Sequence, residues 1–189
     1  MNRVRIIGGE WRSRLLRFPD VPGLRPTPDR VRETVFNWLG QDLTGLNCID
    51  LFAGSGALGF EAASRGARSV VLVEQDRQAV EALRANATAL HAQAVEVVRA
   101  DALEFLRSLR EDKDRGGYDV AFLDPPYVFW GQSQAPAAAL LAGLAAHLAL
   151  GARVYLESPA FAELPQGWQS LKSGRAGAVH YQLLEATSR

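Results

Sequence analysis

Residues 47–59 read NCIDLFAGSGALG, and this stretch decides the fold. Its apolar start predicts a short buried strand, which ends at Asp50 and runs into a turn with glycines at positions 54, 56 and 59. Glycine lets the backbone turn sharply and lets a ligand approach the main chain closely. The run satisfies the pattern G-x-G-x-x-G, and Glu74 lies 20 residues beyond Gly54. Taken by itself, this spacing fits both NAD and S-adenosylmethionine.

Outward from this turn, apolar runs alternate with segments of helical periodicity. Strands are expected at 69–74, 95–98, 118–123 and 152–157, helices at 57–65, 76–91, 101–110 and 135–148, and a final strand pair near 168–173 and 178–185. The continuous apolar run at 69–74 is typical of a strand covered on both faces. The alternation predicts an α/β fold with a mainly parallel sheet. Ligands of such sheets bind beyond the carboxyl ends of the strands.

Acidic residues follow three of the predicted strands and favour S-adenosylmethionine over NAD. Asp50 can hold the cationic methionine end of the cofactor, whereas a carboxylate is unfavourable beside a pyrophosphate. Glu74 can accept both ribose hydroxyls, although a solvated strand end is the alternative. Asp101 can receive the adenine amino group beside the backbone N–H of Ala102, and a helix N-cap explains it equally well. The predicted cofactor-binding residues are Asp50, Phe52, Ala53, Gly54, Gly56, Glu74, Gln75, Asp101, Ala102 and Asp124.

The run Asp124-Pro125-Pro126-Tyr127 follows the strand at 118–123 and is the most specific motif in the chain. The two prolines fix the backbone and remove two N–H donors. The carboxylate of Asp124 and the carbonyl of Pro125 can therefore act as two fixed acceptors for the two N–H groups of an amino group, which orients the nitrogen lone pair. Tyr127 can stack on a base, worth about 1–3 kcal/mol. These four residues are the predicted catalytic set, and a structural proline turn is the alternative.

Basic residues concentrate at the start of the chain. Residues 1–32 contain eight arginines and three acidic residues, so this segment carries +5 and the rest of the neutral chain carries −5. Such asymmetry predicts a nucleic-acid contact, although a solvated strand in an arginine-biased chain is the alternative. Short strands at 3–7 and 14–18 predict a hairpin, followed by a helix from about Thr27 to Leu39. The predicted RNA-binding residues are Arg3, Arg5, Arg12, Arg14, Arg25, Thr27, Arg30 and Arg32.

The composition excludes several classes of protein. The length of 189 residues predicts one domain with a small appendage. No apolar run reaches the roughly 20 residues that span a bilayer, and the start does not resemble a signal peptide. The single cysteine, Cys48, allows no intrachain disulfide, and three histidines far apart in the sequence predict no metal site. A cytoplasmic location is expected.

These motifs resemble a known family. Asp50-LFAGSGALG, Glu74, Asp101 and the DPPY run resemble class I amino-methyltransferases with an (Asn/Asp)-Pro-Pro-(aromatic) motif. More narrowly, RPTPDRVRETVFNW at 25–38 resembles the RsmD family, as do RVRIIGGEWRSRLL at the start and GAVHYQL near the end. The resemblance covers nearly the whole chain. It departs at Pro28, where the family suggests a residue such as Thr, and proline is well tolerated in a first helical turn.

The resemblance implies a fold and an activity. The fold would be a Rossmann-like class I methyltransferase sheet of seven strands, the last one antiparallel, with a small N-terminal hairpin and helix. Residues 1–45 would form a basic RNA-contacting extension and residues 46–189 the domain that binds S-adenosylmethionine. The implied reaction methylates the exocyclic N2 of one guanine in 16S ribosomal RNA, either as RNA or in an assembling small subunit. A monomer is expected.

Three alternatives stay open at this point. The first is another amino target, such as a DNA adenine, a different RNA guanine or a protein glutamine, and the basic start argues against a protein. The second is an NAD-dependent oxidoreductase, which leaves the DPPY motif without a role and is separated by the cofactor that the chain retains. The third is a non-enzymatic RNA-binding or assembly protein, which an activity assay separates because fold does not prove function.

Overall fold

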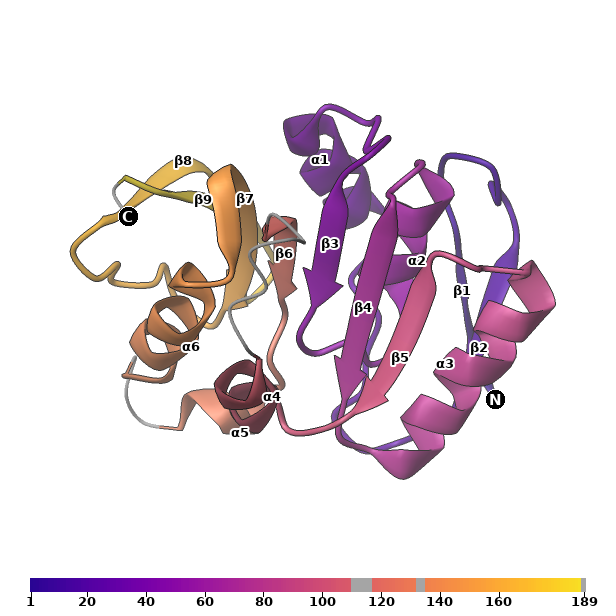
Figure 1. Cartoon of the computed structure of the whole chain (residues 1–189). Helices are drawn as coiled ribbons and strands as arrows, with labels where there is room; N and C mark the ends of the chain where they lie inside the picture. Colours follow the sequence, from indigo (N-terminus) through magenta and orange to yellow (C-terminus); the bar gives the residue numbers. More distant parts are fainter. Residues whose placement is uncertain (110–116, 132–134, 188–189) are drawn as a thin grey trace.

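The structure is a computed structural model that describes residues 1–109, 117–131 and 135–187 (Figure 1). The strands are β1 (Asn2–Arg5), β2 (Leu15–Phe18), β3 (Asn47–Asp50), β4 (Ser69–Glu74), β5 (Val95–Arg99), β6 (Tyr118–Leu123), β7 (Leu148–Ser158), β8 (Trp168–Ala176) and β9 (Val179–Ala186). The helices are α1 (Asp29–Leu39), α2 (Ala57–Ser64), α3 (Arg77–Leu90), α4 (Ala102–Ser108), α5 (Tyr127–Trp130) and α6 (Ala135–Ala145). None of the described helices has the length and apolar character needed to cross a membrane.

The main sheet has seven strands in the order β5-β4-β3-β6-β7-β9-β8. Its first five strands pair in parallel, and β9 pairs antiparallel with both β7 and β8. The order reverses between β3 and β6, which is where open α/β sheets bind their ligands. The predicted seven-stranded sheet with an antiparallel last strand is therefore confirmed.

Both faces of the sheet are covered. Along β4, Val70 and Leu72 contribute to one buried cluster with α1, α2, α3 and the hairpin, whereas Val71 and Val73 contribute to the other with α4 and α6. This alternation follows from the two-residue period of a strand. The fully apolar sequence of the strand is thus explained by burial on both sides.

The N-terminal hairpin, β1 and β2, packs against α3 (Figure 1). Its inward side chains, among them Val4 and Leu16, join the same buried cluster as α1 and α2. Asn86 of α3 fixes the hairpin main chain, because it donates to the carbonyl of Arg17 at 2.8 Å and accepts from the N–H of Arg17 at 3.1 Å. Buried Glu61 of α2 accepts from the N–H groups of residues 7 and 8 at 2.8 and 2.7 Å. The hairpin is therefore bonded to the main domain through its backbone.

Three elements differ from the sequence prediction. Helix α6 ends at Ala145, whereas a helix was predicted over 135–148. Strand β7 begins at Leu148, whereas the apolar pattern indicated 152, because the β6–β7 pairing shifts register and continues past Gly151, which has a φ of 75°. The short helix α5 was not predicted, and it begins where Pro126 occupies the N-cap position. The run EDKDRGG at 111–117, whose composition predicts a charged loop before β6, lies outside the described residues except for Gly117.

Candidate active site

The carboxyl ends of the five parallel strands lie at one edge of the sheet, which faces downward in Figure 1. The glycine turn follows β3, Glu74 ends β4, Asp101 follows β5 and the DPPY motif follows β6. Asp50 of β3 lies opposite Phe122 of β6 in the parallel ladder. The two motifs singled out from the sequence therefore lie next to each other.

The glycine turn needs glycine at both of its left-handed positions. Gly54 has a φ of 50° and Gly56, which precedes α2, has a φ of 79°. A Cβ atom on Gly56 would lie 2.5 Å from Cδ2 of Phe60, so the turn is packed closely on its inner side. A Cβ atom on Gly54 would meet nothing closer than Cγ of Leu24, at 3.7 Å, so the outer side leaves space at the main chain.

Asp50 lies directly behind this turn and is 2% exposed. Its Oδ1 accepts from the N–H of Phe52 at 3.3 Å. Burial is the main cause that raises the pKa of Asp50 to about 7; backbone hydrogen bonds from Phe52 and Gly59 oppose the rise, and the nearby carboxylate of Glu74 adds to it. A cationic ligand group beside Asp50 would favour its charged form.

Glu74 connects the end of β4 to the glycine turn. Its Oε2 accepts from the N–H of Gly54 at 2.9 Å, and its Oε1 accepts from the N–H of Asp76 at 2.8 Å. These bonds fix the orientation of the carboxylate. Each carboxylate oxygen has a second acceptor site, so Glu74 can accept further bonds from a ligand while it holds the turn.

Asp101 is the N-cap of α4. Its Oδ1 accepts from the N–H groups of Leu103 and Glu104 at 2.9 and 3.0 Å, so the N-cap interpretation is confirmed. Asp101 is exposed, as is Gln75, and Ala102 is buried. The role of Asp101 and Ala102 in holding an adenine stays a prediction.

Asp124 lies half-buried in a polar network at the end of β6. The hydroxyl of Thr27 donates to its Oδ2 at 3.2 Å, and its carboxyl shares a hydrogen bond with Glu157 of β7. The hydroxyl of Tyr155 donates to Oε1 of Glu157 at 2.6 Å. Burial raises the pKa of Asp124 well above its usual range, and the carboxylates of Glu157 and Asp50 raise it further.

Sequence reasoning missed Glu157 and Tyr155. Glu157 is buried, and its pKa is raised by burial, although hydrogen bonds with Tyr155, Thr27 and Asp124 oppose this effect. Burial likewise raises the pKa of the Tyr155 hydroxyl well above its usual range. A signal was present in the sequence, since Glu157 is a carboxylate at the end of an apolar strand.

The aromatic residues after the motif differ in exposure. Tyr127 is 62% exposed, whereas Trp130 is buried. The ring of Phe129 lies 5.2 Å from the ring of Phe52, centroid to centroid, and joins the DPPY segment to the glycine turn. The contacts of Phe129 and Trp130 are those of packing residues. Tyr127 is the aromatic side chain of this segment that is available to a base.

The predicted RNA-binding residues do not all lie at the surface. Arg32 was expected to contact RNA, and this expectation is wrong because its side chain is 0% exposed. It forms ion pairs with Asp29 at 2.7 Å and with Glu61 at 3.3 Å. Thr27 is also buried, and it lies against Asp124 instead of on the basic surface. The six predicted residues that are exposed are Arg3, Arg5, Arg12, Arg14, Arg25 and Arg30.

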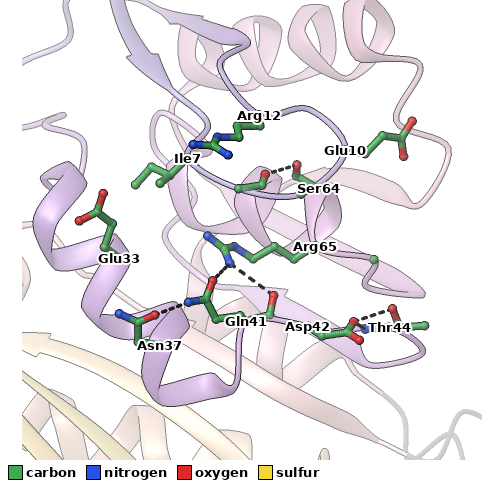
Figure 2. Close-up of a pocket in the computed structure, with 13 residues that line it drawn as sticks. Ile7, Glu10, Arg12, Glu33, Asn37, Gln41, Asp42, Thr44, Ser64 and Arg65 are labelled. Atoms are coloured by element: carbon green, nitrogen blue, oxygen red, sulfur yellow. Dashed lines mark hydrogen bonds between the residues drawn. The ribbon is translucent and has the colours of Figure 1, made fainter.

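A cavity of about 890 Å³ lies elsewhere, between the hairpin turn, α1 and the segments that precede β3 and β4 (Figure 2). Its polar lining is bonded internally, since Arg65 donates to Gln41 and Ser64 donates to the carbonyl of Gly8. It adjoins the amino ends of the strands, so the ligand rule for α/β sheets does not put the active site there. Among the described residues, no group of three or more His, Cys, Asp or Glu side chains could hold a metal ion.

The sheet order and the neighbouring solved structures identify the fold as that of a class I methyltransferase. A family described as "Conserved hypothetical protein 95" matches residues 4–185. The chain belongs to this family, and the predicted resemblance to RsmD proteins is confirmed.

Three similar proteins illustrate the relationship. Ribosomal RNA small subunit methyltransferase D of Escherichia coli K12 is 47% identical over 125 residues, which cover 66% of this chain and 61% of that protein, less than two thirds of its length. The protein of the same name from Haemophilus influenzae is 39% identical over 96% of this chain and 93% of its own length. The solved structure of Escherichia coli yhhF, provisionally described as a methyltransferase, superposes with a TM-score of 0.84 at 36% identity and full coverage of both chains.

Proposed function

We propose that this chain transfers a methyl group from S-adenosylmethionine to the exocyclic N2 of a guanine in 16S ribosomal RNA. The observation that carries the proposal is the position of the half-buried carboxyl of Asp124 beside the glycine turn, at the switch point of the sheet. The names of the relatives with 39–47% identity support the ribosomal RNA substrate.

The residues at the turn fit S-adenosylmethionine. The open side of Gly54 admits a close approach, Glu74 is oriented by two backbone bonds, and Asp50 offers a buried negative group to a cationic end. Phe52, Ala53, Gly56 and Gln75 complete the proposed binding set at β3 and β4, and Asp101 and Ala102 complete it at β5. When bound, the cofactor supplies an already activated methyl group, so the protein has to position and desolvate the acceptor.

The DPPY motif would hold that acceptor. The guanine would be unstacked into the site at a cost of a few kcal/mol. Asp124 and the carbonyl of Pro125 would accept from its two N–H groups, with Pro126 fixing the turn and Tyr127 stacking on the ring. Holding both N–H groups directs the nitrogen lone pair toward the methyl group, which is a positioning effect.

The exposed arginines would bind RNA phosphates. Arg3 and Arg17 lie opposite each other in the hairpin, and Arg5 lies two pairs further along, so the outer face of the hairpin carries a row of positive charge. Affinity from such contacts falls as the salt concentration rises. We propose residues 1–45 as the RNA-contacting extension of the methyltransferase domain at 46–189, acting as a monomer on 16S RNA or on the assembling small subunit.

The test is transfer of labelled methyl from S-adenosylmethionine to 16S RNA and to small subunits that lack the modification, followed by nucleoside analysis. Asp124→Ala removes the proposed acceptor for the amino group, and we expect at least an about 100-fold loss of rate. Asp42→Ala is the matched control, because Asp42 is exposed and lies before β3 at the opposite edge. Label in a different nucleoside would show that the enzyme methylates a different base. An absence of label in any RNA, despite cofactor binding, would overturn the proposal.

A further inference from the structure

A half-buried carboxyl group, Asp124, and a buried one, Glu157, form a pair where the target amino group would dock. Leu123 of β6 lies opposite Leu156 of β7 in the parallel ladder, so Asp124, which follows β6, and Glu157, which still belongs to β7, lie side by side. They share a hydrogen bond. A hydrogen bond between two carboxyl groups requires a proton on one of them, and this contact raises the pKa of Asp124 while it lowers that of Glu157. The pair therefore favours a singly protonated state with the proton on Asp124.

Hydroxyl donors hold this pair from both sides. Thr27 donates to Oδ2 of Asp124 at 3.2 Å, and Tyr155 donates to Oε1 of Glu157 at 2.6 Å. No ion pair among the described residues involves either carboxyl group, so no cation in that part of the chain neutralises the charge of the pair. The other titratable groups that face the pair are Asp50 from β3 and Tyr155 and Tyr181 from β7 and β9.

We infer that Glu157 is a positioning residue for methyl transfer, which takes up the shared proton so that Asp124 meets the amino group as a carboxylate and receives its departing proton. The inference rests on the proposed function. An N–H donor that docks on Asp124 favours the charged form of Asp124 and moves the shared proton to Glu157. Glu157 thus keeps the site at one negative charge while Asp124 changes from acid to base.

Atoms and electrons balance in this step. The nitrogen lone pair forms the new N–C bond while the S–C bond breaks and its electron pair stays on sulfur. The N–H bond breaks, and the proton goes to Asp124, so both carboxyl groups are then protonated and neutral. Asp124, which is half-buried, returns this proton to water after the product leaves. The raised proton affinity of the pair makes Asp124 a stronger base than an isolated surface carboxylate.

The experiment compares the wild-type chain with Glu157→Gln and Tyr155→Phe. Residue-resolved carboxyl NMR titration reads the pair without turnover, and the pH profile of kcat reads its use. In Glu157→Gln the amide donates to Asp124 and carries no charge, so the Asp124 titration should become a single step at lower pH. The acid limb of kcat should move down by about one pH unit or more, with kcat reduced about tenfold. Tyr155→Phe should change both quantities in a smaller degree.

Glu96→Gln, an exposed carboxyl on β5, is the matched control and should change neither readout. A purely structural role for Glu157 would lower kcat at every pH without moving the acid limb, and an unchanged limb in an active Glu157→Gln protein overturns the inference. That result leaves the proposed function in place. A wild-type protein that methylates no amino group overturns both, even where the titration shows a coupled pair.

Discussion

The molecule buries carboxylates in two regions and treats them in opposite ways. Under the hairpin, Glu61 forms ion pairs with Arg32 at 3.3 Å and Arg65 at 2.8 Å and accepts from two backbone N–H groups. At the carboxyl edge of the sheet, Asp50, Asp124 and Glu157 have no such cations among the described residues, and burial raises the pKa of each. A buried carboxylate that is paired with arginines stabilises the fold, whereas buried carboxylates without a cationic partner indicate a catalytic site or a site for a cationic ligand.

The largest effect is expected where the buried carboxylate of Glu61 is paired with arginines. Glu61→Gln leaves buried Arg32 and Arg65 without their shared partner and should lower the free energy of unfolding by about 3–5 kcal/mol. Urea denaturation measures this. Glu81→Gln is the control, since its ion pair with Arg77 is long, at 3.8 Å, and exposed, so about 0.5 kcal/mol or less is expected. A loss below about 1 kcal/mol for Glu61→Gln would show that the cluster is not structural.

A smaller effect, confined to a pH window, sharpens the comparison at the carboxyl edge of the sheet. The folded-state pKa of Asp50 is about 7, above the ordinary value of 3.8, so folding takes up a proton between these values. Its protonated form stabilises the fold fully below pH 4, and that contribution is lost as the pH rises toward 7, at up to about 1.4 kcal/mol per pH unit.

Asp50→Asn removes this dependence. From pH 4 to pH 7, the wild-type protein should therefore lose more free energy of unfolding than the Asp50→Asn protein. Urea denaturation of both proteins at several pH values measures this difference. An S-adenosylmethionine-saturated wild type should lose less, because a cation beside Asp50 favours the carboxylate. Parallel pH dependence in the two proteins would contradict the burial argument.

The smallest effect concerns the surface. Replacing Arg3 and Arg5 together with alanine should weaken RNA binding several-fold. The negative slope of log affinity against log salt concentration should become shallower by about 1 to 2. Filter binding of 16S RNA over a salt series measures this slope. Arg107→Ala, on the exposed surface of α4, is the control. Equal slopes for the wild type, the double variant and the control would contradict a contact between the hairpin and RNA.

The sequence predicted the sheet, the glycine turn and the place of the DPPY motif after β6 because these depend on local patterns. The apolar runs indicated β3, β4 and β6, and the glycine spacing indicated the turn. The error at Arg32 arose because an arginine in a basic segment looks the same whether it faces water or Glu61, which is 29 residues away in the chain. Glu157 was missed because its importance comes from alignment with Asp124 across two strands, and register between strands is not written in either strand alone.

The backbone bonds that Asn86 and Glu61 make to the hairpin have a mechanical consequence. A hairpin held only by side-chain packing could move relative to the sheet, but this hairpin is hydrogen-bonded through its main chain and keeps its position. Its separation from the edge of the sheet where Asp124 lies is therefore fixed. An RNA bound at both places, as proposed, would have to span this fixed separation. The fold would then select a target by the distance between its reactive base and the phosphates that the hairpin arginines bind.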